Sequence, residues 1–165
     1  LCNGILKNLK NEGAVIKLGS PLTLSETNIV AELTRAVKVI PKTIQNKPKS
    51  AVKIFISTRA ARYYELAIYA THPALLRYDA SGGTPTLTFA GYEMIETPGL
   101  YDNTFLITDP ENLIFATDLA SDINTIEFVR NPDPGKRKKY NFVGSFKMGF
   151  SYIKPAEIVL YNGVS

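Results

Sequence analysis

The sequence has one cysteine and one histidine, and both scarcities limit the chemistry that the chain can perform. Cys2 alone forms neither an internal disulfide nor a multi-cysteine metal site, which suits a reducing compartment. His72 is the single candidate for the commonest general base, and its place just after an expected helix favours a capping or surface role. No segment matches a phosphate-binding loop. These absences favour a binding or structural role, so we assign no catalytic residue and expect no cofactor.

Long hydrophobic runs are missing as well. No stretch approaches the roughly 20 apolar residues that cross a bilayer, and the first residues lack a signal-peptide pattern. The acidic residues of the second half match neither an EF-hand loop nor another carboxylate template for a divalent cation. We therefore expect no membrane partner and no bound metal.

The composition is that of an ordinary globular domain. The chain has 165 residues, of which 45% are hydrophobic and 21% are charged. A chain of this length buries roughly 70% of its unfolded surface, so a single core is expected. The sequence begins with Leu1 rather than Met, and we expect a fragment or a processed product.

Two segments have the apolar spacing of amphipathic helices. The first follows Thr23 and Glu26, which match a capping box, and Pro41 interrupts it. The second follows a short strand at residues 52–56 and runs to about Ala70. Either of two adjacent residues is expected to cap this second helix: Ser57 or Thr58. Three residues are expected to form its inward face: Tyr63, Leu66 and Ala67.

The second half of the chain has the composition of a β-rich region. Five segments resemble strands and are separated by Gly, Pro, Asn and Asp: TLTF, YEMIE, TFLIT, NLIFAT and TIEFVR. Helical and strand segments do not alternate regularly, so the expected fold class is α+β.

One expected strand is unusually long. From Tyr140 to Tyr152 apolar and polar residues alternate with the two-residue period of a strand. These thirteen residues are more than twice the usual strand length. A basic run, GKRKK, precedes the strand and is expected to be a solvated hairpin tip.

Charges of opposite sign are confined to different parts of the chain. Eight cations and no acid lie between Leu33 and Tyr64, whereas nine acids and no cation lie between Tyr78 and Val129. In one explanation the two blocks face each other inside one domain. In the other they form opposite flanks that attract the next copy in a head-to-tail contact. A nucleic-acid groove is disfavoured because the basic block lacks interleaved stacking aromatics.

Several short motifs follow one another in a characteristic order. The chain opens with NGIL, and FISTRAARYYELA leads into the second helix. The segments FAGYEMI, PGLYD and NLIFATD come next, followed by the long strand with Gly144 near its middle and the closing AEIV. Over nearly the whole chain this order resembles that of the major capsid proteins of tailed bacteriophages, which have the Hong Kong 97-like fold.

The resemblance implies an α+β Hong Kong 97-like fold with an axial domain and part of a peripheral domain. Residues 1–19 would be a peripheral segment, residues 20–125 the axial domain at the capsomer centre, and residues 126–165 long peripheral strands. The family carries an N-terminal arm, an extended loop and a spine helix before the element that NGIL resembles, so we expect these parts to be missing. The family's peripheral sheet packs along the spine helix, so the resemblance implies that five residues would cover that helix in a longer chain that has it: Tyr140, Phe142, Phe146, Met148 and Phe150.

The function implied by the resemblance is structural. The chain would be a subunit of an icosahedral phage or prophage capsid that self-assembles into pentamers and hexamers and encloses double-stranded DNA. It would reside in the virion capsid and, during assembly, in the bacterial host cytoplasm. Expected partners are other copies, scaffold or portal proteins, and packaged DNA non-specifically at most. Two alternatives stay open: an encapsulin-like nanocompartment shell protein, and a soluble α+β ligand-binding domain or enzyme.

The resemblance also gives the two charge blocks a use, because neighbours in a ring are oriented alike. A basic flank of one copy would meet an acidic flank of the next. The expected interface residues are Arg35, Lys38, Lys42, Lys49, Arg59, Arg62, Glu93, Glu96, Asp102, Asp109, Glu111 and Asp118. The basic hairpin tip is either solvated or in contact with packaged DNA or an adjacent capsomer. The residues that would make this contact are Lys136, Arg137, Lys138 and Lys139.

Overall fold

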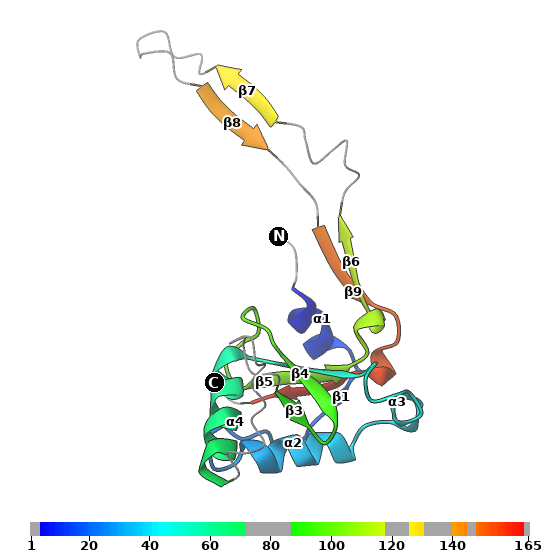
Figure 1. The fold of residues 1–165 in the computed structure, drawn as a ribbon. Coiled ribbons are helices and arrows are strands. Elements are labelled where there is room, and N and C mark those ends of the chain that lie inside the picture. Colours follow the sequence, from blue (N-terminus) through cyan, green and yellow to red (C-terminus); the bar gives the residue numbers. More distant parts are fainter. Residues whose placement is uncertain (1–3, 72–86, 118–125, 131–139, 145–147, 164–165) are drawn as a thin grey trace.

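The centre of the molecule is a six-stranded mixed sheet (Figure 1). We describe residues 4–71, 87–117, 126–130, 140–144 and 148–163 of a computed structural model. The strands of the sheet are, in spatial order, β1 (Ile16–Lys17), β10 (Val159–Asn162), β5 (Thr104–Thr108), β2 (Lys53–Ile56), β4 (Tyr92–Glu96) and β3 (Thr88–Phe89).

The sheet has a defined register. β1 is parallel to β10 and β2 is parallel to β4, while the other neighbouring pairs are antiparallel. The pairings align four residues in one row across four strands: Glu96, Ile56, Phe105 and Tyr161. The rings of Phe105 and Tyr161 stack with centroids 4.6 Å apart.

Helices cover both faces of the sheet. α2 (Ile29–Lys38) and α4 (Thr58–Thr71) cover one face, and α1 (Ile5–Asn11) covers the other (Figure 1). A short helix, α3 (Lys42–Gln45), follows α2. Alternate residues of the central strands serve the two cores: Phe105 packs with the α2 and α4 side, and Leu106 with α1. All five residues of β5 are therefore buried.

The first predicted helix is present as α2, and its apolar spacing is confirmed, but its predicted cap is not. α2 begins at Ile29, so the capping box of Thr23 and Glu26 is wrong. The side chain of Asn28 organises this turn instead, accepting a hydrogen bond from Ser25 N at 2.8 Å and donating one to Thr23 O at 2.9 Å.

The second predicted helix is α4, and its predicted start at Ser57 or Thr58 is confirmed. Ser57 Oγ accepts a hydrogen bond from Ala60 N at 3.4 Å. The predicted inward face is wrong at Leu66, whose side chain is exposed. The buried residues of this helix are instead Ala60, Ala61 and Tyr64, which lie on the face turned to the sheet. The Tyr64 hydroxyl donates to Thr88 O at 2.7 Å, and burial raises its pKa to about 12.

Two further ladders extend from the sheet. β6 (Leu113–Thr117) pairs antiparallel with β9 (Met148–Tyr152), and this pair, which we call the ribbon, leaves the body of the molecule (Figure 1). β7 (Ile126–Arg130) pairs antiparallel with β8 (Tyr140–Gly144). The predicted long strand is thus described as two strands with different partners, and residues 145–147 between them lie outside the described part.

The domain boundaries after residues 19 and 125 stay a prediction. β1 comes from the first segment and β10 from the last, and both pair within the sheet that the middle segment forms. No helix within the described ranges is long and apolar enough to cross a membrane. Several residues discussed above lie outside the described residues: Cys2, His72, Asp118, Lys136, Arg137, Lys138, Lys139 and Phe146.

Candidate assembly surfaces

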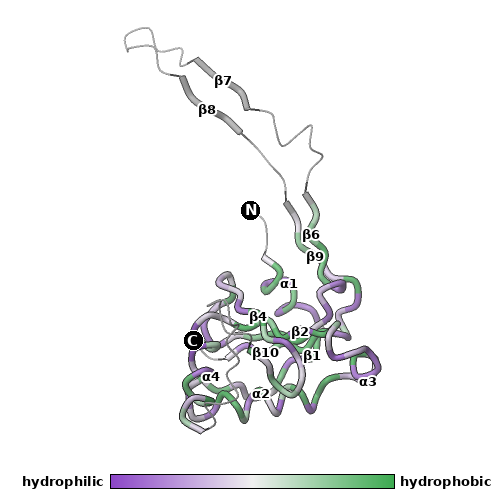
Figure 2. The backbone as a smooth tube through the Cα atoms, viewed as in Figure 1, coloured by the Kyte–Doolittle hydropathy of each residue, from purple (hydrophilic) through white to green (hydrophobic). Residues whose placement is uncertain are grey.

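The ribbon presents an apolar face that is packed, among the described residues, at its base. Leu113 pairs with Tyr152 and Phe115 with Phe150, and the alternation of a strand places both pairs on one face. Leu113 and Tyr152 pack against the core under α1. Phe115 and Phe150 lie one pair further out and are 56% and 38% exposed, with ring centroids 5.0 Å apart. Figure 2 shows that hydrophobic residues continue along β6 outside the body.

Exposed apolar side chains also occur elsewhere along the ribbon. Ile114 lies on the opposite face from Phe115 and is exposed, as is Ile153 just after β9. A two-stranded ladder has two free edges and little core of its own. Exposed apolar side chains thus lie on both faces of the ribbon.

A charged cluster holds the ribbon where it leaves the sheet. We call it the ribbon node, and it consists of Lys47, Asp109 and Glu157. Lys47 Nζ lies 2.7 Å from Asp109 Oδ2 and 3.3 Å from Glu157 Oε2. Both carboxylates are nearly buried. The hydrogen bond from Lys47 lowers the pKa of Asp109, and the same bond raises the pKa of Lys47.

Asn112 ties the two corners of the ribbon to each other. It ends a 3-10 helix, Pro110–Asn112, whose first turn is capped by Asp109 Oδ1 accepting from Glu111 N at 3.0 Å. Asn112 Oδ1 accepts from Ile153 N at 3.2 Å and from Lys154 N at 2.7 Å. Its Nδ2 donates to Lys154 O at 2.9 Å. The outgoing and returning chain are therefore joined, and the base of the ribbon is braced.

The two charge blocks meet inside the chain. β2 lies between β4 and β5, so basic residues of one block stand next to acidic residues of the other. Three pairs cross between the blocks: Lys53 with Glu93, Arg59 with Asp102 at 3.2 Å, and Lys47 with Asp109. For these residues the structure supports the first of the two explanations. Asp109 in particular is buried, so its predicted place on an exposed flank is wrong.

The other predicted interface residues are divided between local bonds and solvent. Arg35 pairs with Glu32 in the same helix at 3.3 Å, and Lys49 Nζ donates to Ala90 O at 2.8 Å. Five are exposed and form no ion pair with another described residue: Lys38, Lys42, Arg62, Glu96 and Glu111. Whether any of the predicted residues contacts a second copy stays a prediction.

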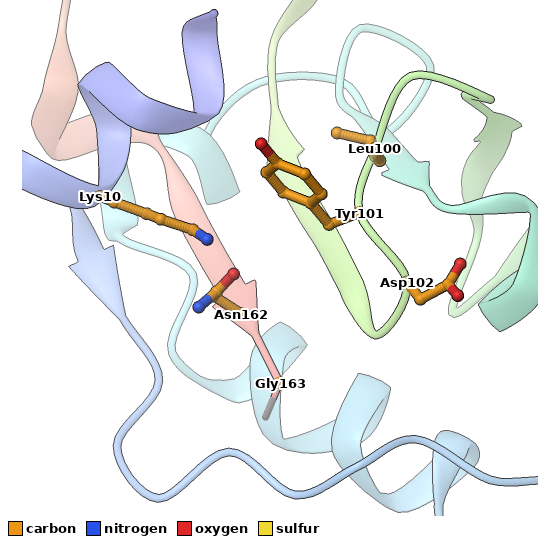
Figure 3. A pocket seen from close by; sticks show the side chains of 6 residues that line it. All are labelled: Lys10, Leu100, Tyr101, Asp102, Asn162 and Gly163. Atoms are coloured by element: carbon orange, nitrogen blue, oxygen red, sulfur yellow. The ribbon is translucent and has the colours of Figure 1, made fainter. Parts of the chain in front are cut away.

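A shallow hollow of about 610 Å³ opens between α1, the loop after β4 and the end of β10. Figure 3 shows Lys10 extending from α1 toward Asn162 and Tyr101. Lys10 Nζ lies 5.0 Å from the centroid of the Tyr101 ring. A second hollow of about 330 Å³ shares Lys10 and Asn162 and adds Lys17, Leu18 and Leu160. No sequence pattern indicates this site, because residues 10, 17 and 162 come together only through the packing of α1 and the pairing of β1 with β10.

The hollows have no arrangement typical of catalysis. Their described linings contain one carboxylate, Asp102, and it is engaged by Arg59. Within the described residues, no group of three or more His, Cys, Asp or Glu side chains is placed to hold a metal ion.

Comparison with known proteins identifies the fold. No family model and no curated protein matches the chain. Among solved structures, a chain of Mycobacterium phage Che8 matches 92% of this chain and 55% of its own length, with a TM-score of 0.57 and 14% identity. The virus-like particle from Pyrococcus furiosus matches 96% of this chain and 60% of its own, with a TM-score of 0.55 and 15% identity.

A third similar structure is the satellite phage P4 procapsid, which includes the size determination (Sid) protein. It matches 96% of this chain and 51% of its own, with a TM-score of 0.52 and 14% identity. The chain thus spans 51% to 60% of the length of these three structures. At such identities the likeness shows the fold alone.

Proposed function

We propose that this chain, which has the Hong Kong 97-like α+β fold that its motif order predicted, is a structural subunit of a self-assembling shell. Similar chains occur in a procapsid and in a virus-like particle. The proposed role is to associate with further copies, without turnover of a substrate.

The observation that carries this proposal is the uncovered apolar face of the ribbon. Phe115 and Phe150 continue a face that is packed at Leu113 and Tyr152, and their rings contact each other while remaining exposed. Burying a large apolar side chain stabilises by about 1.5 to 3 kcal/mol, so a segment that covers this face gains substantially. A braced ribbon with an apolar face suits a protein whose partner packs along it.

The finer proposal is a phage or prophage capsid around double-stranded DNA. Two of the three similar structures come from phages. In that setting the protein resides in the virion capsid after assembly in the host cytoplasm. DNA, scaffold and portal proteins would be its partners besides other copies.

A nanocompartment shell is the second candidate. It is favoured by the likeness to the virus-like particle from Pyrococcus furiosus, which has a TM-score close to that of the phage chain. The two candidates differ in what the shell encloses, either nucleic acid or protein cargo.

Particle size tests the proposal. We expect the chain, or any longer natural form that contains it, to give closed shells or five- and six-fold rings in negative-stain microscopy and sedimentation. Nuclease-protected DNA in purified particles would favour the virus capsid, and a co-purifying enclosed protein would favour the compartment. A monodisperse monomer in every form, at high protein concentration and at varied salt, would contradict both.

A further inference from the structure

We infer that neighbouring copies join through opposite edges of the six-stranded sheet, where Lys10 and Lys17 of one copy receive Glu96 of the next. The inference rests on the proposed function, because it names the surface through which shell subunits associate. The partner is a second copy of this chain in the same orientation.

The cationic edge is the smaller hollow, which runs along β10 and β1 and which we call the cationic groove. Lys10 and Lys17 both line it, and Lys17 Nζ donates to the backbone carbonyl of Lys10 at 2.6 Å. Neither lysine forms an ion pair with another described residue, and Asp102, which lines the larger hollow, is already engaged by Arg59 at 3.2 Å. Leu18 and Leu160 supply apolar lining. The groove therefore fits a carboxylate on a partly apolar surface.

The acidic edge is the end of β4. β3 pairs only with Tyr92 and Glu93, so at Glu96 the outermost described strand is β4 itself. Glu96 is exposed, and no described cation pairs with it. Glu93, by contrast, is engaged by Lys53. Glu96 is thus the carboxylate of this edge that remains available to another chain.

The register places the two edges at the same height. Glu96, Ile56, Phe105 and Tyr161 form one row across four strands, and Asn162, which follows Tyr161, lines the groove. Strands lie about 4.8 Å apart, so the row is about 15 Å wide. A like-oriented copy placed beside the first therefore brings its groove level with Glu96. Such a head-to-tail contact uses two different surfaces and closes into a ring when the rotation allows.

Four members of the charge blocks are poor candidates for the same contact. Lys53, Arg59, Glu93 and Asp102 already pair with each other inside the chain. Lys10 and Lys17 lie outside both blocks and form no ion pair with a described acid. A hydrogen bond from Tyr152 lowers the pKa of Glu12, and the charge of Lys17 helps to lower it further. The β1 edge thus offers a basic surface to another copy in addition to the exposed lysines of the basic block.

A charge-swap experiment tests the contact in the assembling protein. We expect Lys10→Glu with Lys17→Glu to lower the yield of rings or shells at least tenfold, and Glu96→Lys to do the same. The triple variant that carries all three changes is expected to restore most of the yield. Lys10→Glu alone keeps the Lys17 hydrogen bond, whose acceptor is a backbone carbonyl, and therefore separates lost association from lost folding. Circular dichroism of each variant reports the fold.

Lys7→Glu is the matched control, because Lys7 is an exposed lysine of the same helix and does not line the groove. It is expected to leave the yield unchanged. Folded groove and Glu96 variants that assemble as well as the unmodified protein would overturn the contact and leave the proposed function standing. A triple variant that stays as defective as its parents would overturn the pairing. Failure of the unmodified protein to form any particle would count against the proposed function itself, and the contact would fall with it.

Discussion

Lys47 neutralises two nearly buried carboxylates at the base of the ribbon. Lys47→Met keeps most of the side-chain volume and removes the cation that contacts both Asp109 and Glu157, so that Lys154, at 3.5 Å from Glu157 Oε1, is the cation that remains beside Glu157. We expect the free energy of unfolding to fall by about 1 to 3 kcal/mol, toward the lower end because a third of the Lys47 side chain is exposed. Urea unfolding measures the loss. Lys42→Met, at an exposed lysine of α3, is the control and should change stability by less than about 0.5 kcal/mol.

The same cluster predicts a dependence of stability on pH. The pKa of Asp109 is lowered from its ordinary 3.8, chiefly by the hydrogen bond from Lys47, which itself also faces Glu157. A carboxylate with a lowered pKa contributes stability above its unfolded pKa and loses it as the pH falls through the folded value. We therefore expect the stability advantage over Asp109→Asn to be full above about pH 5 and to shrink below about pH 4. Unfolding curves of both proteins from pH 7 to pH 2.5 would contradict this if their difference stayed constant.

Gly163 closes the end of β10 against two other segments. A Cβ at this position would lie 2.8 Å from Asn103 O and 2.8 Å from Leu22 O, both of them backbone atoms. Gly163→Ala is expected to lower stability by about 1 to 3 kcal/mol, because the backbone has to shift. Gly99→Ala is the matched control, since a Cβ there meets nothing within 4 Å. Equal melting temperatures of the two variants would refute the close approach.

At the scale of the element, the ribbon separates stability from association. Phe115→Ser with Phe150→Ser removes two exposed rings, so we expect the free energy of unfolding to change by no more than about 1 kcal/mol. Association with further copies, measured by sedimentation velocity, should fall sharply if this face is covered in the assembly. Leu113→Ser should do the opposite and lower stability by about 1 to 2 kcal/mol, because Leu113 packs against the α1 core. Unchanged association of the double variant would show that the face is not a contact.

The same elements show what sequence patterns specify. The strand at residues 53–56 and the helix capped by Ser57 were predictable, because period and cap are local signals. The capping box at Thr23 failed, because Asn28 organises that turn. The inward face of α4 was misplaced at Leu66, since hydrophobicity alone does not say which side meets the sheet. The first error is a local one, in the choice of the residue that organises the turn, and the second comes from packing between segments distant in sequence.

At the scale of the whole molecule, charge layout depends on topology. The sequence separates a basic block from an acidic block, but the insertion of β2 between β4 and β5 brings the blocks side by side. The cationic groove was not predictable, because it needs α1, β1 and β10 together. One strand of the ribbon, β9, lies in the long alternating segment that ends at Tyr152, whereas its pairing with β6 was not predicted.

Two lysines of the basic block remain exposed on and after α2. Lys38 and Lys42 are exposed and form no ion pair with a described acid, so they are free to attract an acidic surface of another copy. Lys38→Glu with Lys42→Glu is expected to reduce ring formation while leaving the melting temperature nearly unchanged. The effect should shrink between about 0.05 and 0.5 M salt, because exposed charges are screened over about 10 Å at 0.1 M. Particle yield by sedimentation at both salt concentrations measures it. If this variant assembles normally while reversal of Lys10 and Lys17 blocks assembly, the contact lies at the sheet edges and not beside α2.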